Sequence, residues 1–341
     1  MMRPVRVPRI GVIVTVIAAI SVCALLGAGL NYAAPAAADQ KDQIQKAQRQ
    51  FEAGDYNAAV TSLQSVISQE PNSAEARYWL GRAYYENRDY DNSAAQEEKA
   101  ASLDPKSSIY HQWLGRAYGG QADRERSFSL ARKVKKEFAE AVRLGPSNIE
   151  ARRDLEDFCL EAPWIVGGSK DEARAQVEAI AAIDPVEGHL AKAVLDKAQG
   201  KPDFEENEYH QILSAKPSKI EPYLEAAEFF ARQNKPVDLD ATIQAAVAIS
   251  PNDPRIGYYR GVLGAVSGGT GSAQAEQYLK AYVASTPNRS NWPPHAAARE
   301  WLGRLYEAQG KRAEAAEQYR AALQLDPGRK EARNRLDKLS H

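Results

Sequence analysis

The chain has 341 residues, which is enough for two or three ordinary domains or for one extended array. Apolar residues make up 44% and charged residues 26%, so a globular chain is expected and a disordered one is excluded. The formal net charge of −1 excludes a surface that is basic enough overall to bind nucleic acid.

The first 38 residues have the layout of a secretory signal. Three arginines precede an uncharged apolar run over residues 10–30, and small residues follow as far as Asp39. We expect cleavage after Ala38 and export of the remaining chain, either to the periplasm or out of the cell. The apolar run of 21 residues is also long enough to span a bilayer. The alternative is therefore an uncleaved inner-membrane anchor with the rest of the chain facing outward, and this segment is the only expected membrane contact.

Beyond residue 38, short sequences recur at regular intervals. WLGRAY occupies residues 79–84 and again 113–118, and WLGRLY occupies residues 301–306. Within each interval, apolar and small residues follow helical spacing in two runs that a short turn separates. A proline then closes each interval, and these prolines are Pro71, Pro105, Pro146, Pro185, Pro217, Pro251, Pro287 and Pro327. The pattern predicts repeated pairs of helices, because proline ends a helix and forces an extended residue before it.

The repeated unit resembles the tetratricopeptide repeat, a helix-turn-helix of about 34 residues with a W-x-x-L-G-x-x-Y, A-x-x-x-F and P pattern. Leu80-Gly81, Leu114-Gly115 and Leu302-Gly303 carry the resemblance in the second, third and last units. It implies an all-α fold, a right-handed superhelical solenoid of about eight units preceded by the signal peptide. The units are expected near residues 40–73, 74–107, 108–148, 149–185, 186–219, 220–253, 254–289 and 296–329, and a C-terminal capping helix over 330–341.

Insertions lengthen some of the units. We expect residues 119–132 to extend the turn of unit three and residues 162–170 to extend the turn of unit four, because loops absorb extra residues more easily than packed faces do. Trp164 lies in the second of these segments. It is either an exposed contact for a partner or a plug that fills the groove between units, and we favour the plug.

Chemistry-bearing motifs are sparse along the chain. The glycine-rich segments lack the spacing of a phosphate-binding loop, and the five histidines form no pair at metal-ligand spacing. Cys159 aligns with Tyr84 and Tyr118 of the repeat, so we predict a buried core residue and not a nucleophile. We therefore expect no enzymatic activity, no catalytic residue, no metal and no cofactor.

The resemblance implies an exported scaffold that binds a partner protein or peptide in a concave groove. Eight units of roughly 34 residues use up the chain after residue 38 and leave no room for a catalytic domain. The alternative is an accessory or regulatory subunit of an enzyme or of an envelope-assembly complex. No nucleic-acid partner is expected.

The groove residues can be assigned through the resemblance. In tetratricopeptide arrays the first helix of each unit lines the groove, and the residue after the Leu-Gly pair faces it. This places Arg82 and Arg116 in the groove, together with Arg153 on the following first helix. Tyr78 and Tyr85 flank them and would supply rigid aromatic surface. Because Arg binds carboxylates in a bidentate manner, these residues suit an acidic partner protein or peptide, or the C-terminal carboxylate of a peptide.

A competing interpretation uses the same arginines inside the protein. Arginines at a surface commonly form weak ion pairs with neighbouring carboxylates, worth roughly 0 to 1 kcal/mol each. Glu86 and Asp157 are examples of acids near enough in sequence to form such pairs. The sequence leaves both interpretations open.

Overall fold

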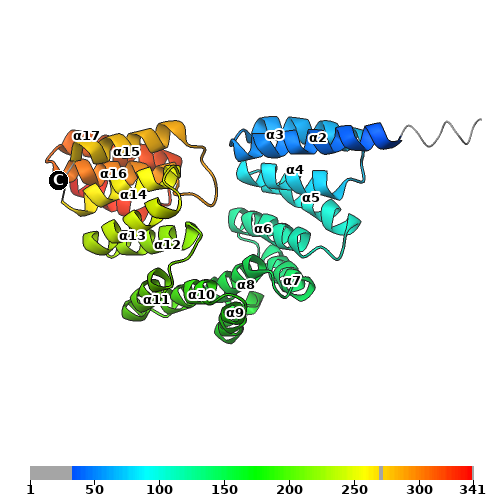
Figure 1. Cartoon of the computed structure of the whole chain (residues 1–341), viewed down its shortest axis with the longest axis horizontal. Helices are drawn as coiled ribbons and strands as arrows, with labels where there is room; N and C mark the ends of the chain where they lie inside the picture. Colours follow the sequence, from blue (N-terminus) through cyan, green and yellow to red (C-terminus); the bar gives the residue numbers. More distant parts are fainter. Residues whose placement is uncertain (1–32, 269–271, 340–341) are drawn as a thin grey trace, which may run out of the picture.

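The fold is known from a computed structural model, which describes residues 33–268 and 272–339. Over these residues the chain contains helices and turns but no strand, arranged as eight antiparallel helix pairs and one further helix (Figure 1). The expected all-α repeat solenoid is thereby confirmed. None of these helices is both long and apolar enough to cross a membrane.

The helices follow one another in pairs, each pair forming one unit. They are α2 (Ala33–Glu52) and α3 (Tyr56–Gln69), α4 (Ala74–Glu86) and α5 (Tyr90–Leu103), α6 (Ser108–Glu125) and α7 (Phe128–Leu144), α8 (Ile149–Glu161) and α9 (Lys170–Ile183), α10 (Pro185–Ala198) and α11 (Pro202–Ala215), α12 (Glu221–Arg232) and α13 (Pro236–Ile249), α14 (Pro254–Val266) and α15 (Ser272–Ser285), α16 (His295–Ala308) and α17 (Arg312–Leu325), and finally α18 (Lys330–Leu339). Residues 1–32 of the expected signal segment lie outside the described part. Residues 33–38 belong to α2, so the expected cleavage after Ala38 falls inside this helix.

Side chains at the turns fix where the helices begin. The side chains of Ser73, Asp89 and Asn148 accept hydrogen bonds from backbone N–H groups in the first turns of α4, α5 and α8, which would otherwise have no partner. Gly54 and Gly310 end first helices with φ of 79° and 73°, a conformation that favours glycine. Short turns of this kind force each second helix to run back along the first.

Glycine lets the two helices of a unit approach closely. A Cβ atom added to Gly115 of α6 would lie 2.5 Å from the ring of Phe138 on α7, and one added to Gly303 of α16 would lie 2.4 Å from the ring of Tyr319 on α17. Both aromatic side chains are buried. The repeated Leu-Gly pair is therefore part of the packing face inside the units that contain it, which explains why the chain repeats it.

The extra residues of unit three do not lie where the sequence predicts them. The extra residues 119–132 were expected to lengthen the turn, but they continue the two helices, and only residues 126 and 127 lie between α6 and α7. Arg126 turns the chain with φ of 52°, and Ser127 Oγ accepts a hydrogen bond from the N–H of Leu130 to begin α7. The prediction was wrong because two helices lengthened together keep burying surface against each other. In unit four, residues 162–169 do form a loop, which contains the 3₁₀ helix η1 (Trp164–Val166).

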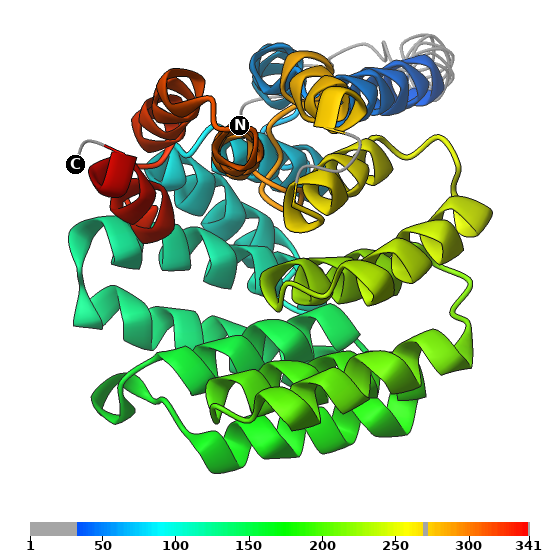
Figure 2. The same cartoon turned by 90° about the vertical axis from the view of Figure 1, so that its left-hand side faces the viewer.

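The array curves until the connection between units seven and eight touches units one and two. In Figure 1, α8–α11 form the bottom of the curve, and units one and two face units seven and eight above it. Figure 2 looks from the side of units seven and eight, so the two groups overlap at the top of that view. The connection 286–294 closes the gap. Ser290 donates hydrogen bonds from its backbone N and from Oγ to the carboxylate of Glu86, at 2.9 and 2.7 Å. Pro287 packs onto Gly54, so closely that a Cβ added to this glycine would lie 2.1 Å from Pro287 Cβ.

Candidate functional site

The inner surface of the curve contains a continuous groove. Three cavities of about 610, 660 and 540 Å³ follow one another along units two to seven. The first and second share Arg116, Asp154 and Asp157, and the second and third share Glu225 and Arg255. We call this connected space the groove. It is lined mainly by the first helices α6, α8, α10, α12 and α14.

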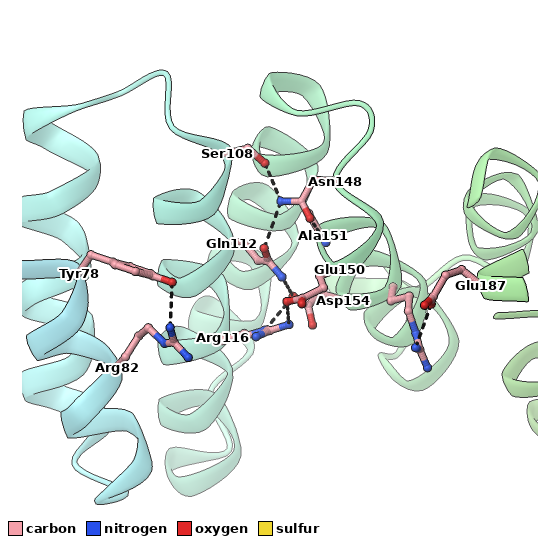
Figure 3. Close-up of polar contacts among 11 residues, drawn as sticks. Tyr78, Arg82, Ser108, Gln112, Arg116, Asn148, Glu150, Ala151, Asp154 and Glu187 are labelled. Atoms are coloured by element: carbon pink, nitrogen blue, oxygen red, sulfur yellow. Dashed lines mark hydrogen bonds and ion pairs between the residues drawn. The ribbon is translucent and has the colours of Figure 1, made fainter. Parts of the chain in front are cut away.

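A relay of polar side chains fixes the upper part of the groove (Figure 3). Asn148 begins α8 by accepting a hydrogen bond from the N–H of Ala151 at 3.1 Å. Its Nδ2 donates to Ser108 Oγ at 3.0 Å and to Gln112 Oε1 at 3.2 Å, and Gln112 Nε2 donates to Asp154 at 2.7 Å. The relay joins α6 to α8 and holds the Asp154 carboxylate at the groove surface.

Arg116 and Arg153 bridge successive first helices. Arg116 Nε donates to Asp154 at 2.8 Å, and its Nη2 lies 3.4 Å from Glu150 (Figure 3). Arg153 of α8 binds Glu225 of α12 at 3.1 and 2.9 Å and Glu187 of α10 at 3.4 Å. The interpretation that these arginines form internal ion pairs therefore holds for both. The acids are, however, those of following units, and not Glu86 or Asp157.

Arg82 takes part in a cluster of aromatic rings. Its guanidinium carbon lies 4.5 Å from the ring centres of Trp79 and Trp113 and 4.8 Å from that of Phe51. Nη1 donates to the hydroxyl of Tyr78 at 3.2 Å, as Figure 3 shows. Within the described residues Arg82 forms no ion pair with an acid, and it does not line the groove. Cation–π contacts of this kind stabilise the packing between units one, two and three.

The two predicted tyrosines lie in different places. Tyr78 is buried among Trp79, Tyr110 and Trp113, and this burial raises its pKa above the ordinary value. Tyr85 meets Trp113 edge-on, with ring centres 5.7 Å apart, and lines the first cavity of the groove. Of the five residues predicted for the groove, Tyr85, Arg116 and Arg153 line it, whereas Arg82 and Tyr78 belong to the packing. A role in binding stays a prediction for all five.

Trp164 is 85% exposed, so the favoured interpretation as a plug is wrong. Val166, two residues later, fills the interior position and is buried. Gly167, with φ of 110°, then turns the chain toward α9. The 3₁₀ turn thus points the side chain of Val166 inward and leaves that of Trp164 exposed. Cys159, by contrast, is buried in the core as predicted, and burial raises the pKa of its thiol.

Carboxylates dominate the groove, and the sequence analysis missed this. Seven carboxylates and four cationic side chains line the second cavity, namely Glu150, Asp154, Asp157, Asp184, Glu187, Glu221, Glu225, Arg116, Arg153, Lys219 and Arg255. Burial, with the charges of Asp154 and Glu161 close by, raises the pKa of Asp157 to about 6 although Arg153 opposes the shift. The signal was available, because residues 150, 154, 157 and 161 are acidic at spacings of four, three and four, which places them on one helix face.

The residue types that bind metals are dispersed over the part of the chain that the structure describes. No group of three or more His, Cys, Asp and Glu residues is placed to hold a metal ion there. His111 and His189 bind Glu137 and Glu208, at 2.7 and 2.6 Å, as partners within helix pairs.

Comparison with known proteins identifies the repeats. Residues 44–108 and 296–329 match family models of the tetratricopeptide repeat. No curated protein matches the chain. The fold is similar to the crystal structure of a tetratricopeptide repeat protein from Parabacteroides merdae ATCC 43184, with a TM-score of 0.51, 15% identity, and coverage of 89% of this chain and 99% of that one. It is also similar to a chain in the crystal structure of an APC/C hetero-tetramer, with a TM-score of 0.50, 11% identity, and coverage of 88% of this chain and 55% of that one. At these identities the likeness concerns the fold alone.

Proposed function

We propose that this tetratricopeptide repeat protein is an exported scaffold that holds an extended segment of a partner protein in the groove. Helical repeat arrays serve in general as surfaces for protein or peptide binding, and their extended concave faces are the usual contact. The observation that carries the proposal is the continuous groove along units two to seven, lined mainly by polar and aromatic side chains of the first helices.

The shape of the groove favours a segment over a folded domain. The contact of Ser290 with Glu86 joins the two ends of the array, so repeat units bound the groove on both sides. Cavities of about 540 to 660 Å³ have the size of side-chain or small-ligand pockets. An extended peptide can place successive side chains into such a series.

The internal ion pairs change the partner that the groove favours. An acidic partner is the expectation if Arg82, Arg116 and Arg153 are free in the groove. Arg116 and Arg153 are satisfied by carboxylates of the same chain, and Arg82 lies among aromatic rings. Replacing these contacts with a partner's carboxylates would gain little, because the internal acids would lose their own counter-ions. The proposed partner segment is therefore not acidic.

Export is part of the proposal and rests on the basic head, the apolar run and the small residues before Asp39. Sequencing the N-terminus of the protein recovered from outside the cytoplasm tests it. A chain that begins near Asp39 supports cleavage, whereas an intact chain in the membrane fraction supports the anchored alternative. A protein found only in the cytoplasm would contradict both.

Site-specific photo-crosslinking in the exporting cell tests the binding function. A photoreactive amino acid at Tyr85 lies in the groove. One at Phe204 of α11 is the matched control, since Phe204 is 61% exposed and lines none of the three cavities. We expect a discrete crosslinked partner from position 85 and none from position 204. Crosslinks from position 204 alone would reject the groove as the binding surface.

A further inference from the structure

The first cavity of the groove lies between units two, three and four. It has a volume of about 610 Å³ and opens between the end of α6, the start of α7 and the end of α8. We call it the unit 3–4 cavity. Its apolar and small lining residues include Tyr85, Gly119, Gly120, Phe128, Pro163 and Val166.

Gly119 forms part of the lining without serving the packing of the chain. A Cβ added to Gly115 would meet Phe138 at 2.5 Å, and one added to Gly120 would meet Tyr90 at 2.4 Å, but one added to Gly119 meets nothing within 4 Å. Glycine inside a helix costs about 0.5 to 1 kcal/mol relative to alanine. The corresponding position of unit two, four residues after the Leu-Gly pair, holds Tyr85. Glycine at position 119 leaves room that another molecule can occupy.

Two carboxylates stand at the unfavourable end of a helix. Asp157 and Glu161 lie in the last two turns of α8, where the partial negative charge of the helix terminus disfavours acids, and the last turn contains no basic residue. Neither forms an ion pair within the described residues. The cavity as a whole is lined by four carboxylates, the other two being Asp123 and Asp154, and by Arg116 and Arg126. Since Arg116 is bound to Asp154, the side formed by α8 stays negative.

An apolar ring is exposed beside these acids. Phe128, the first residue of α7, lines the cavity and is 59% exposed, although large apolar side chains normally gain free energy by leaving water. Pro163 and Val166 line it from the loop that exposes Trp164, so this loop forms one wall. An apolar side chain placed here would cover Phe128 and fill the space above Gly119.

We propose that the unit 3–4 cavity is the specificity pocket of the groove, and that it receives an apolar side chain of the partner over Gly119 and a neighbouring Lys or Arg at Asp157 and Glu161. This inference rests on the proposed binding function and adds the chemistry of the bound segment, which is apolar and basic. Three separate features support this inference. A helical glycine that packing does not require, an exposed aromatic ring, and acids without an ion pair at a helix C-terminus each cost stability, and all three line the same cavity.

A random library of displayed twelve-residue peptides, selected on the purified protein, tests the inference. We expect enriched peptides to carry Lys or Arg next to a large apolar residue, with affinity that falls as salt is raised. Gly119→Leu fills the pocket, and the double variant Asp157→Asn with Glu161→Gln removes its charge; each should weaken the enriched peptides at least tenfold.

Gly257→Leu is the matched control, because Gly257 is also helical and open, with its nearest neighbour at 3.9 Å, but lies in α14 outside the cavity. It should bind the peptides like the original protein, and all variants should retain the original helical circular-dichroism spectrum. Enriched peptides that are acidic, or that bind Gly119→Leu with unchanged affinity, would overturn the pocket while leaving a groove that binds elsewhere. A protein that enriches no peptide at all would contradict the proposed function as well.

Discussion

The carboxyl group of Glu97 packs directly onto Gly81, where a Cβ added to the glycine would lie 2.5 Å from Glu97 Oε1. In units three and eight the same place against the Leu-Gly glycine is held by the rings of Phe138 and Tyr319. Glu97 is fully buried, and neither of its carboxyl oxygens has a hydrogen-bond partner. Burial consequently raises the pKa of Glu97 well above its ordinary value.

Replacing this acid should stabilise unit two. We expect Glu97→Leu to raise the free energy of unfolding by about 1 to 3 kcal/mol at pH 7, because a buried polar group without a partner loses its hydration on folding. The gain should grow between pH 5 and pH 8, since the unfolded carboxyl ionises more readily than the folded one. Urea denaturation measures it, with Glu178→Leu at an exposed position of α9 as control. An unchanged or lower stability of Glu97→Leu would contradict the prediction.

Two glycines of α6 should respond to alanine with opposite signs. Gly115→Ala forces a methyl group against the Phe138 ring and should cost about 1 to 3 kcal/mol. Gly119→Ala meets no neighbour and should stabilise the helix by about 0.5 to 1 kcal/mol. Thermal denaturation of the pair at equal concentration compares them directly. Stabilisation by both would show that the contact of position 115 with Phe138 is not tight, and destabilisation by both would show that position 119 is not open.

Glu156 should make stability depend on pH. This side chain is almost fully buried, and burial together with the charge of Asp157 raises its pKa to about 8, with Arg153 opposing the shift. The folded carboxyl keeps its proton after the unfolded one has lost it, so stability falls as the pH rises from about 4.5 to about 8. Glu156→Gln should remove a loss on the order of 3 kcal/mol at pH 7. Urea denaturation from pH 5 to pH 8 tests this, and parallel curves for the two proteins would refute it.

Arg153 should be needed for the packing of three successive units. It joins α8 to Glu187 of α10 and Glu225 of α12, so Arg153→Ala leaves both carboxylates without their cation. We expect a loss of about 1 to 3 kcal/mol. The control is Arg174→Ala, whose surface pair with Asp171 should contribute less than about 1 kcal/mol. Chemical denaturation measures the free energy of unfolding of both variants. Equal decreases would mean that the ion pairs of Arg153 across units contribute no more than a surface ion pair.

Closure of the array should depend on Glu86. Reversing its charge in Glu86→Arg removes the acceptor of both Ser290 hydrogen bonds and brings a cation near Arg289, which lines the same small cavity. We expect a larger radius of gyration in small-angle X-ray scattering, with the melting temperature changed by only a few degrees because the contact is exposed. Glu70→Arg, at the exposed end of α3, should scatter like the original protein. Superimposable curves for Glu86→Arg would contradict closure by this contact.

Local sequence patterns predicted most of the fold. The helix pairs follow from apolar spacing and from glycine and proline punctuation, and these act within a few residues of one another. The two copies of WLGRAY predicted a repeated packing face because Gly81 and Gly115 must each admit a neighbouring helix, whatever the rest of the chain does. The buried position of Cys159 followed from the same repeat.

The groove was decided by contacts between distant residues. The hydrogen-bonded pairs Arg116–Asp154, Arg153–Glu225 and Ser290–Glu86 are separated by 38, 72 and 204 residues in the sequence. Such pairs depend on the small rotation between successive units, which accumulates into the curvature of the whole array. A short segment of sequence does not predict this rotation. The sequence by itself thus determined that the chain forms stacked helix pairs. Only the tertiary structure decided which arginines are neutralised, which tryptophan stays outside and where the acids converge, because each of these requires two units to be placed relative to each other.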